Sequence, residues 1–231
     1  MLITGGSSGI GRLTALAFAA HGAQVAVASR REPESLEAAG GEGLFVQTDV
    51  SKANEVENMV AKTVERFGRL DFAFNNAGTE GDVFVPLIEY PEETWDAVID
   101  TNLKGVFLSM KYELPHIINA RGAIVNMSSV AGLSGRGMGA AYTASKHGVI
   151  GLTKSAAAVR QVRRAGQRGR ASRDRNPNGR AWLRAQRSRA SGEGGELAST
   201  RAGWYAGRSG ERRTLAVLER HVVHDWVDVG D

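Results

Sequence analysis

The chain has 231 residues, of which 42% are hydrophobic, and this length and composition suit one sizeable α/β domain rather than two. It contains no cysteine, which excludes a disulfide framework and a thiolate metal site, and no apolar run reaches the ~18 residues that a bilayer span requires. Because no leader of the secretory kind follows Met1, we expect a cytoplasmic enzyme or binding protein.

The net charge of +4 hides a break in composition near residue 158. Residues 1–158 hold 13 Lys and Arg against 17 Asp and Glu, a net charge of −4. Residues 159–231 hold 16 against 8, a net charge of +8, and all 16 of these basic residues are Arg. The chain is therefore expected to divide into a core, residues 1–158, and an Arg-rich tail, residues 159–231.

Residues 2–4 predict the end of a buried strand, which runs directly into a glycine-rich turn and a helix start. Glycines let the backbone approach a pyrophosphate closely, and a helix N-terminus offers it free N–H groups and a partial positive charge. A flexible glycine loop is the alternative. The residues of the predicted phosphate cradle are Gly5, Ser7, Ser8, Gly9, Ile10 and Gly11. The residues that the following helix is predicted to bury are Leu13, Leu16, Ala17 and Ala20.

A second short strand is predicted over residues 24–28, and the residues after it bear on the choice of cofactor. In a dinucleotide-binding fold, an acidic residue at this point binds the ribose 2′-hydroxyl of NAD. This sequence has Ser29, Arg30 and Arg31 instead, and a hydroxyl with guanidinium groups suits a 2′-phosphate. NADP is favoured, with NAD as the alternative. The arginines would otherwise belong to a solvated turn.

Three further apolar runs predict strands at residues 44–47, 71–74 and 123–127, with helical stripes between them. Strands that alternate with helices predict an α/β fold with a doubly wound parallel sheet of Rossmann type, whose ligands bind at the carboxyl ends of the strands. Polar groups follow each of these strands. They are Asp49 after the third strand, Asn75 and Asn76 after the fourth, and Ser128 and Ser129 after the fifth.

Asn102 falls inside the apolar stripe of a long helix predicted from Thr94, a stripe that also includes Trp95 and Phe107. A buried amide without partners costs ~1–3 kcal/mol. Asn102 is therefore predicted to be a satisfied core residue, or to hold a water near the reactive site, or both.

Tyr142 and Lys146 are four residues apart, which places them one turn apart on the same face of a helix. A free phenol titrates near pH ~10, and a cation within ~4–6 Å favours its ionised form, which would make a general acid and base. Ser129, thirteen residues before Tyr142, is placed to offer a hydroxyl to a bound carbonyl. The alternative is an ordinary surface pair, and His147 is expected to be a surface residue.

Six motifs occur in one order along residues 1–158, and together they resemble the short-chain dehydrogenase/reductase family. They are Thr4-Gly5-x-x-x-Gly9-x-Gly11, Asp49-Val50, Asn75-Asn76-Ala77-Gly78, Asn102, Ser129 and Tyr142-x-x-x-Lys146. The resemblance implies a Rossmann-type fold in which NAD or NADP exchanges a hydride with an alcohol or ketone.

The resemblance also implies a role for each matching residue. Tyr142 would protonate the ketone oxygen, Lys146 would favour the phenolate and bind the nicotinamide ribose together with Tyr142, Ser129 would bond the substrate oxygen, and Asn102 would position a water. Lining residues would be Asp49 and Val50 at the adenine, and Asn76, Ala77 and Gly78 along the adenosine. A homodimer or homotetramer, packed through the helices that carry Asn102 and Tyr142, is implied as well.

From about residue 159 the resemblance stops, and the family's sixth and seventh strands are not recognisable. The sheet is therefore expected to be incomplete, with an unpaired edge at the fifth strand. GC-rich codons read one base out of frame yield Arg without Lys. Permitted codons for residues 159–178, read one base later, give Tyr-Ala-Lys-Ser and then Pro-Gly-Ile-Val-Thr-Pro-Met, which is the missing sixth-strand motif. We predict a frameshift, which sequencing of the coding DNA around codon 158 would reveal.

The alternative is a disordered Arg-rich tail that binds nucleic acid, attached to a cofactor-binding remnant without activity. Removal of residues 159–231 would then abolish salt-dependent DNA binding. We favour a small-molecule alcohol or ketone as the partner over nucleic acid, and expect no membrane association.

Overall fold

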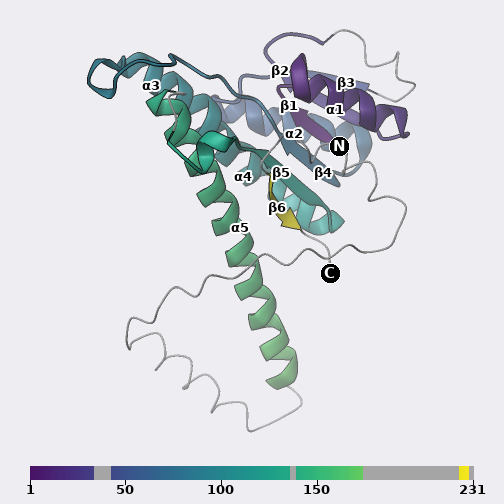
Figure 1. Ribbon diagram of the computed structural model, residues 1–231. Coiled ribbons are helices and arrows are strands. Elements are labelled where there is room, and N and C mark those ends of the chain that lie inside the picture. The colour runs from purple at the N-terminus through teal and green to yellow at the C-terminus, as the bar shows by residue number, and fades with distance from the viewer. Residues whose placement is uncertain (34–42, 136–138, 174–223, 229–231) are drawn as a thin grey trace, which may run out of the picture. The chain divides into compact units, whose positions relative to one another are not determined.

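The computed structural model describes residues 1–33, 43–135, 139–173 and 224–228, with side chains up to residue 158 (Figure 1). The chain divides into two compact units, one made of Met1–Ala157 with Leu218–Asp231 and the other of Ala158–Val217. Most of the Arg-rich tail therefore lies outside the described residues.

Five parallel strands form the body of the sheet in the order β3-β2-β1-β4-β5. Their bounds are β1 (Leu2–Thr4), β2 (Val25–Ser29), β3 (Gly43–Gln47), β4 (Phe72–Asn75) and β5 (Ala123–Met127). Each lies within one residue of the run that predicted it. The order reverses at β1, with crossovers to both sides, so the prediction of a Rossmann-type parallel sheet is confirmed.

Helices cover both faces of this sheet, because alternate strand residues point to opposite sides. The helices are α1 (Gly9–Ala20), α2 (Ala53–Phe67), α3 (Glu92–Ile99), α4 (Gly105–Ala120) and α5 (Ala140–Arg173). Leu2, Ala73 and Ile124 pack into one core with side chains of α2, α4 and α5. Ile3 and Phe74 pack on the other face with side chains of α1.

The face that α1 buries differs from the predicted one. The helix buries Gly11, Thr14, Ala15 and Ala19, and Leu16 packs partly buried against the core. Leu13 is 66% exposed, and Ala17 and Ala20 are exposed too, so the prediction for these three residues is wrong. A Cβ added at Gly11 would lie 2.4 Å from the Gly5 carbonyl oxygen. This close contact with the glycine turn fixes the rotation of α1. Small residues therefore occupy the buried face, and Leu13 lies on the exposed side.

The long helix predicted from Thr94 is interrupted. A π-helical turn over Asp100–Lys104 separates α3 from α4 and carries the buried Asn102. Trp95 and Phe107 are 37% and 48% exposed, so their prediction as core residues is wrong. The wider turn shifts the helix face by part of a turn, which a regular period cannot anticipate.

The prediction of an unpaired edge at β5 is also wrong for the described residues. A short strand, β6 (His224–Asp228), pairs antiparallel along the whole of β5, from Ala123 opposite Asp228 to Met127 opposite His224. The helix α5 likewise continues to Arg173, past the point where helical periodicity fades. Ala and Arg are strong helix formers, so a helix continues there without an apolar stripe.

Candidate active site

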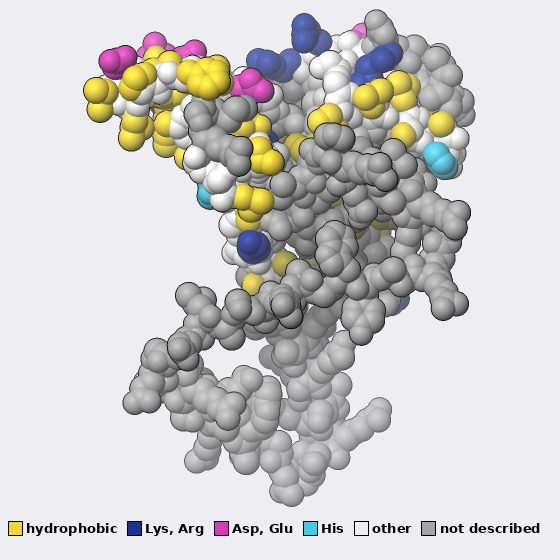
Figure 2. Space-filling model, in the orientation of Figure 1, with side chains coloured by type: hydrophobic (Ala, Val, Ile, Leu, Met, Phe, Trp, Pro, Cys, Tyr) yellow, Lys and Arg dark blue, Asp and Glu magenta, His cyan; other side chains and the backbone are white. Residues whose placement is uncertain are grey.

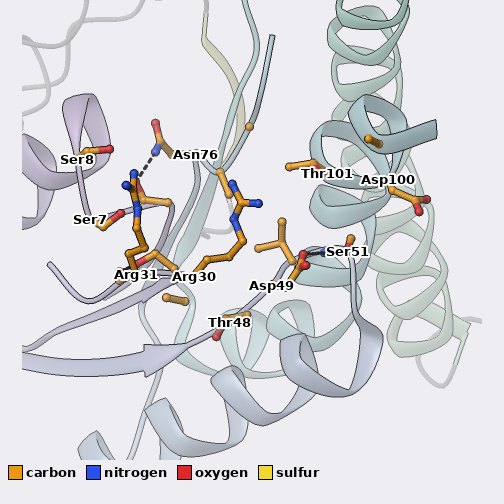
Figure 3. A pocket seen from close by; sticks show the side chains of 17 residues that line it. Ser7, Ser8, Arg30, Arg31, Thr48, Asp49, Ser51, Asn76, Asp100 and Thr101 are labelled. Atoms are coloured by element: carbon orange, nitrogen blue, oxygen red, sulfur yellow. Dashed lines mark hydrogen bonds between the residues drawn. The ribbon is translucent and has the colours of Figure 1, made fainter. Parts of the chain in front are cut away.

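A cleft of about 490 Å³ lies at the carboxyl ends of the strands, where the topology of the sheet reverses (Figure 3). Its lining residues are Gly5, Ser7, Ser8, Ala28, Ser29, Arg30, Arg31, Thr48, Asp49, Val50, Ser51, Asn76, Ala77, Gly78, Ala97, Asp100 and Thr101. The cleft is thus built from the turns that follow β1, β2, β3 and β4, together with the end of α3.

Most of the residues predicted to bind a cofactor line this cleft, but the end of the glycine motif does not, and neither do Tyr142 and Lys146. Gly9, Ile10 and Gly11 lie outside the lining, and Ile10 is 44% exposed. Gly11 acts through packing instead, since it sits against Gly5. Six lining residues were not predicted from the sequence, and they are Ala28, Thr48, Ser51, Ala97, Asp100 and Thr101.

The turns after β1 and β4 are fastened to each other by hydrogen bonds. The Asn76 and Ala77 amides both donate to Thr4 Oγ1, at 3.0 and 3.1 Å, and Asn76 Nδ2 donates to the Thr4 and Gly5 carbonyls at 3.2 Å. A Cβ at Gly5, where φ is +67°, would lie 2.8 Å from Ala77 Cα. Only glycine fits here. The backbone at the floor of the cleft is therefore held close and free of side chains, as a pyrophosphate requires.

Charged groups mark the end of the cleft beyond β2 and β3. Figure 3 shows Arg30 and Arg31 extending between Ser7 on one side and Asp49 on the other. Partial burial opposes ionisation of Asp49, but the Ser51 amide at 3.0 Å, Ser51 Oγ at 2.8 Å and the charges of Arg30 and Lys52 hold its pKa below the ordinary value. This end of the cleft offers a fixed carboxylate and two guanidinium groups to a ligand.

Asn102 is fully buried in its π-helical turn, and its amide is bonded at both ends. Oδ1 accepts from the Thr79 amide at 2.8 Å, and Nδ2 donates to the Thr79 carbonyl at 2.8 Å and to Ser145 Oγ at 3.1 Å. Ser145 in turn donates to the Tyr142 carbonyl at 2.7 Å. The prediction of a satisfied core amide is confirmed, and Asn102 ties the segment after β4 to the helix of Tyr142.

Lys146 is 4% exposed on α5, and its ammonium lies 5.6 Å from the centroid of the Tyr142 ring. Nζ donates to the Met127 carbonyl at 2.9 Å. Burial lowers the pKa of Lys146 to about 8. A partly desolvated ammonium thus stands beside a half-buried phenol, whereas His147 is exposed, as expected of a surface residue.

Ser129 caps a short 3₁₀ turn at Val130–Gly132, and its Oγ accepts from the Ala131 amide at 3.2 Å. The preceding Ser128 donates to the Lys146 carbonyl at 3.0 Å. A Cβ at Gly132 would lie 2.8 Å from that same carbonyl. The turn that carries Ser129 is therefore pressed against α5 beside Lys146.

Gly78 links the cleft to the residues predicted to be catalytic. It lines the cleft, and a Cβ added to it would lie 3.1 Å from Asn102 Oδ1 and 3.7 Å from Lys146 Nζ. Lys146 and Asn102 therefore adjoin the cleft at Gly78. The fold thus brings Asn102, Lys146 and the strand-end turns to one place.

The segment between β4 and α3 exposes apolar side chains next to the start of α5. Phe84, Leu87 and Ile88 are 79%, 73% and 94% exposed, and yellow side chains gather over this part of the molecule in Figure 2. A Cβ at Gly139 would lie 2.5 Å from the Asp82 carbonyl oxygen. An apolar surface is therefore anchored beside the residues that lead into α5.

A parallel sheet whose strand-end cleft lies beside a buried lysine and a tyrosine four residues apart defines an α/β protein of Rossmann type. The model of the family described as short chain dehydrogenase matches residues 1–163. The chain belongs to this family.

The matches to known relatives cover about as many residues of the chain as the family model does. The chain is 46% identical over 164 residues to the 3-oxoacyl-(acyl-carrier-protein) reductase FabG of Staphylococcus aureus, covering 68% of this chain and 66% of that protein. It is 43% identical over 163 residues to a 3beta-hydroxysteroid dehydrogenase of Mediterraneibacter gnavus, covering 68% of this chain and 59% of that protein.

Solved structures give the same coverage. The crystal structure of levodione reductase superposes with a TM-score of 0.64 at 41% identity, over 68% of this chain and 64% of the other. An NAD⁺-bound xylitol dehydrogenase superposes with a TM-score of 0.65 at 35% identity, over 68% and 62%. The chain thus spans about two thirds or less of the length of these four proteins.

Proposed function

We propose that the chain is an NAD(P)-dependent oxidoreductase that interconverts an alcohol and a ketone, with Tyr142 as general acid and base. The observation that carries this proposal is the position of Lys146, buried beside the Tyr142 ring and close to Gly78, which lines the cleft. A nicotinamide cofactor bound there would supply the hydride. Family membership supports the same reaction class.

The protein's own residues supply position and proton transfer. Tyr142 gives a proton to the ketone oxygen during reduction and takes it back during oxidation. The Lys146 ammonium lies 5.6 Å from the centroid of the Tyr142 ring and would bind the nicotinamide ribose, and its bond to the Met127 carbonyl holds it in place. Ser129 orients the substrate oxygen. Asn102 holds the Thr79 backbone, and with it the wall of the site, in place.

We propose NADP as the preferred cofactor. Two guanidinium groups, from Arg30 and Arg31, and the Ser29 residue line the end of the cleft beyond β2, where the 2′-position of the adenosine ribose belongs in this fold. Arginine is well suited to phosphate because its fixed fork of N–H donors matches phosphate oxygens. None of the three residues Ser29, Arg30 and Arg31 carries the carboxylate that would bind a free ribose 2′-hydroxyl.

For the substrate, we propose a secondary alcohol or ketone with an apolar portion. The exposed side chains of Phe84, Leu87 and Ile88 lie on the segment anchored beside the start of α5.

We further propose a homodimer or homotetramer and a cytoplasmic location. Among the described residues, no helix combines the length and hydrophobicity that crossing a lipid bilayer demands.

The substitution Tyr142→Phe tests the reaction. It is expected to lower the turnover of NADPH with a panel of apolar ketones by at least about 100-fold, the usual contribution of a general acid. Tyr112→Phe is the matched control, since Tyr112 lies on α4 and packs on the core. Its turnover should equal that of the wild type. Full activity of the Tyr142→Phe protein would rule out the proposed role.

A further inference from the structure

A chain of buried polar side chains crosses the core between α4 and α5, beneath the predicted site. Asn75 Nδ2 donates to Glu113 Oε2 at 3.0 Å and to Asn126 Oδ1 at 2.9 Å. Asn126 Nδ2 donates to Thr153 Oγ1 at 2.9 Å. Glu113 and Asn126 are fully buried, and Asn75 and Thr153 are 2% and 1% exposed. One network therefore joins α4, β4, β5 and α5.

Glu113 begins this network, and its surroundings suit a neutral carboxylic acid. Burial raises its pKa to about 7, and the only opposing influence is the hydrogen bond from Asn75. Oε1 has no hydrogen-bond partner within the described part of the chain. An ionised carboxylate held by a single neutral donor in an apolar core is costly, whereas the protonated acid still accepts the Asn75 bond.

The amides that Glu113 orients stand directly beneath the site. Asn75 precedes Asn76, whose amide and side chain fasten the turn after β4 to Thr4. Asn126 precedes Met127, whose carbonyl receives Lys146 Nζ. Both N–H groups of the Asn75 side chain are used, one on Glu113 and one on Asn126, so the acceptor at Glu113 sets which way this amide faces.

We propose that Glu113 is a positioning residue that acts as an uncharged hydrogen-bond acceptor: it orients Asn75 so that the carboxyl ends of β4 and β5 keep the spacing that the cofactor turn and Lys146 need. Glu113 touches neither the cleft nor the reacting groups. Its influence on cofactor binding rests on the proposed function, whereas its influence on the two strand ends does not.

Four variants of the full chain test this role at pH 6. Glu113→Gln keeps a neutral acceptor of the same shape, and Glu113→Met keeps the length without one. Thr153→Val removes the bond to Asn126 at the far end of the network. Ile117→Val is the packing control, because Ile117 is fully buried one turn further along α4 and outside the network.

The dissociation constant of NADPH and the hydrogen exchange of residues 76–78 and 127–129 are the measurements. Glu113→Gln is expected to stay within about twofold of the wild type, and Glu113→Met to weaken NADPH binding about five- to tenfold, the range of one neutral hydrogen bond. Thr153→Val should weaken it in the same direction, and exchange should speed up in step. Ile117→Val should change neither measurement.

The proposal is overturned by wild-type behaviour of Glu113→Met, by a Glu113→Gln protein as impaired as Glu113→Met, or by an equal loss in Ile117→Val. Should Glu113→Met not fold, Thr153→Val decides: unchanged binding and exchange in that variant overturn the network. A wild type that binds no NADPH would count against the proposed function alone, since the exchange measurement still reads the strand ends.

Discussion

At the scale of single residues, Lys146 carries a conflict between stability and function. Burial lowers its pKa to about 8 in the folded protein, against 10.5 in an exposed lysine. Between these values the unfolded chain binds more protons than the folded one, so the free energy of unfolding rises with pH from about 8 to about 10.5. Below pH 8 both states are charged, and the folded state bears the full cost of the buried ammonium.

Replacing this lysine should therefore stabilise the protein while disabling it. At pH 7 the Lys146→Met variant is expected to unfold with a free energy higher by up to about 3 kcal/mol, because a tenfold change in proton affinity corresponds to ~1.4 kcal/mol. Turnover should fall at least about 100-fold. Denaturant unfolding between pH 7 and pH 10.5 measures the first effect, and the rise of stability with pH should disappear.

Lys154→Met is the control for this experiment, because Lys154 lies on the same helix but is exposed. It should leave both the turnover and the pH dependence of unfolding unchanged. If Lys146→Met instead destabilises the protein at pH 7, the bond to Met127 and the contact with Tyr142 outweigh the cost of burial, and the expected conflict does not exist.

Arg30 belongs to the same scale, since one side chain is proposed to select the cofactor. Arg30→Ala should weaken NADPH binding at least about tenfold and NADH binding at most about twofold, because a charged hydrogen bond to phosphate contributes ~1.5–3 kcal/mol. Fluorescence titrations with the two cofactors measure this. Arg69→Ala is the control, as Arg69 is exposed and pairs with Asp71. Equal losses for NADPH and NADH would contradict the proposed selection.

At the scale of elements, the sequence predicted the strands better than the faces of the helices. Each of the five parallel strands is a short apolar run with Gly, Ser, Asp or Asn within two residues of its end, and this pattern is local. The face that α1 buries depends on the contact between Gly11 and Gly5, which lie in different elements, so the burial predicted for Leu13 was wrong. Trp95 and Phe107 were misplaced because the π-helical turn shifts the helical period between them.

The same distinction holds for the candidate site. Residues in the turns directly after strands, such as Asp49 and Asn76, could be predicted because every strand of a parallel sheet ends at the same edge. Asp100 and Thr101 reach the cleft from the π-helical turn after α3, and nothing local in the sequence indicates where that turn crosses the strand ends. Thr48 and Ser51 flank Asp49, and could have been found by extending the prediction one or two residues each way.

At the scale of the whole molecule, three independent boundaries fall close together. The charge changes sign near residue 158, the family match ends at residue 163, and the first compact unit is interrupted after Ala157. The predicted frameshift would account for an in-family segment followed directly by an unrelated one, and it stays a prediction. What lies beyond the boundary matters to the first unit in one respect, because Leu218–Asp231 belongs to it and supplies β6.

The strand β6 decides whether the sheet ends in an open edge. Exposed strand edges pair with other chains and promote aggregation. Deletion of residues 224–231 removes β6 and should leave the protein prone to self-association, with amides of β5 exchanging at least about tenfold faster, as expected when a strand loses its partner. Deletion of residues 229–231 alone leaves β6 in place and is the control.

Light scattering as a function of concentration and hydrogen exchange resolved to residues 123–127 measure the two effects. If β6 protects the edge, the longer deletion aggregates at concentrations where the shorter one stays dispersed, and its added exchange is confined to β5. If both deletions behave like the full chain, the pairing of β5 with β6 contributes nothing in solution, and the five parallel strands are sufficient for the fold. The comparison therefore establishes how much of this molecule depends on residues outside the family match.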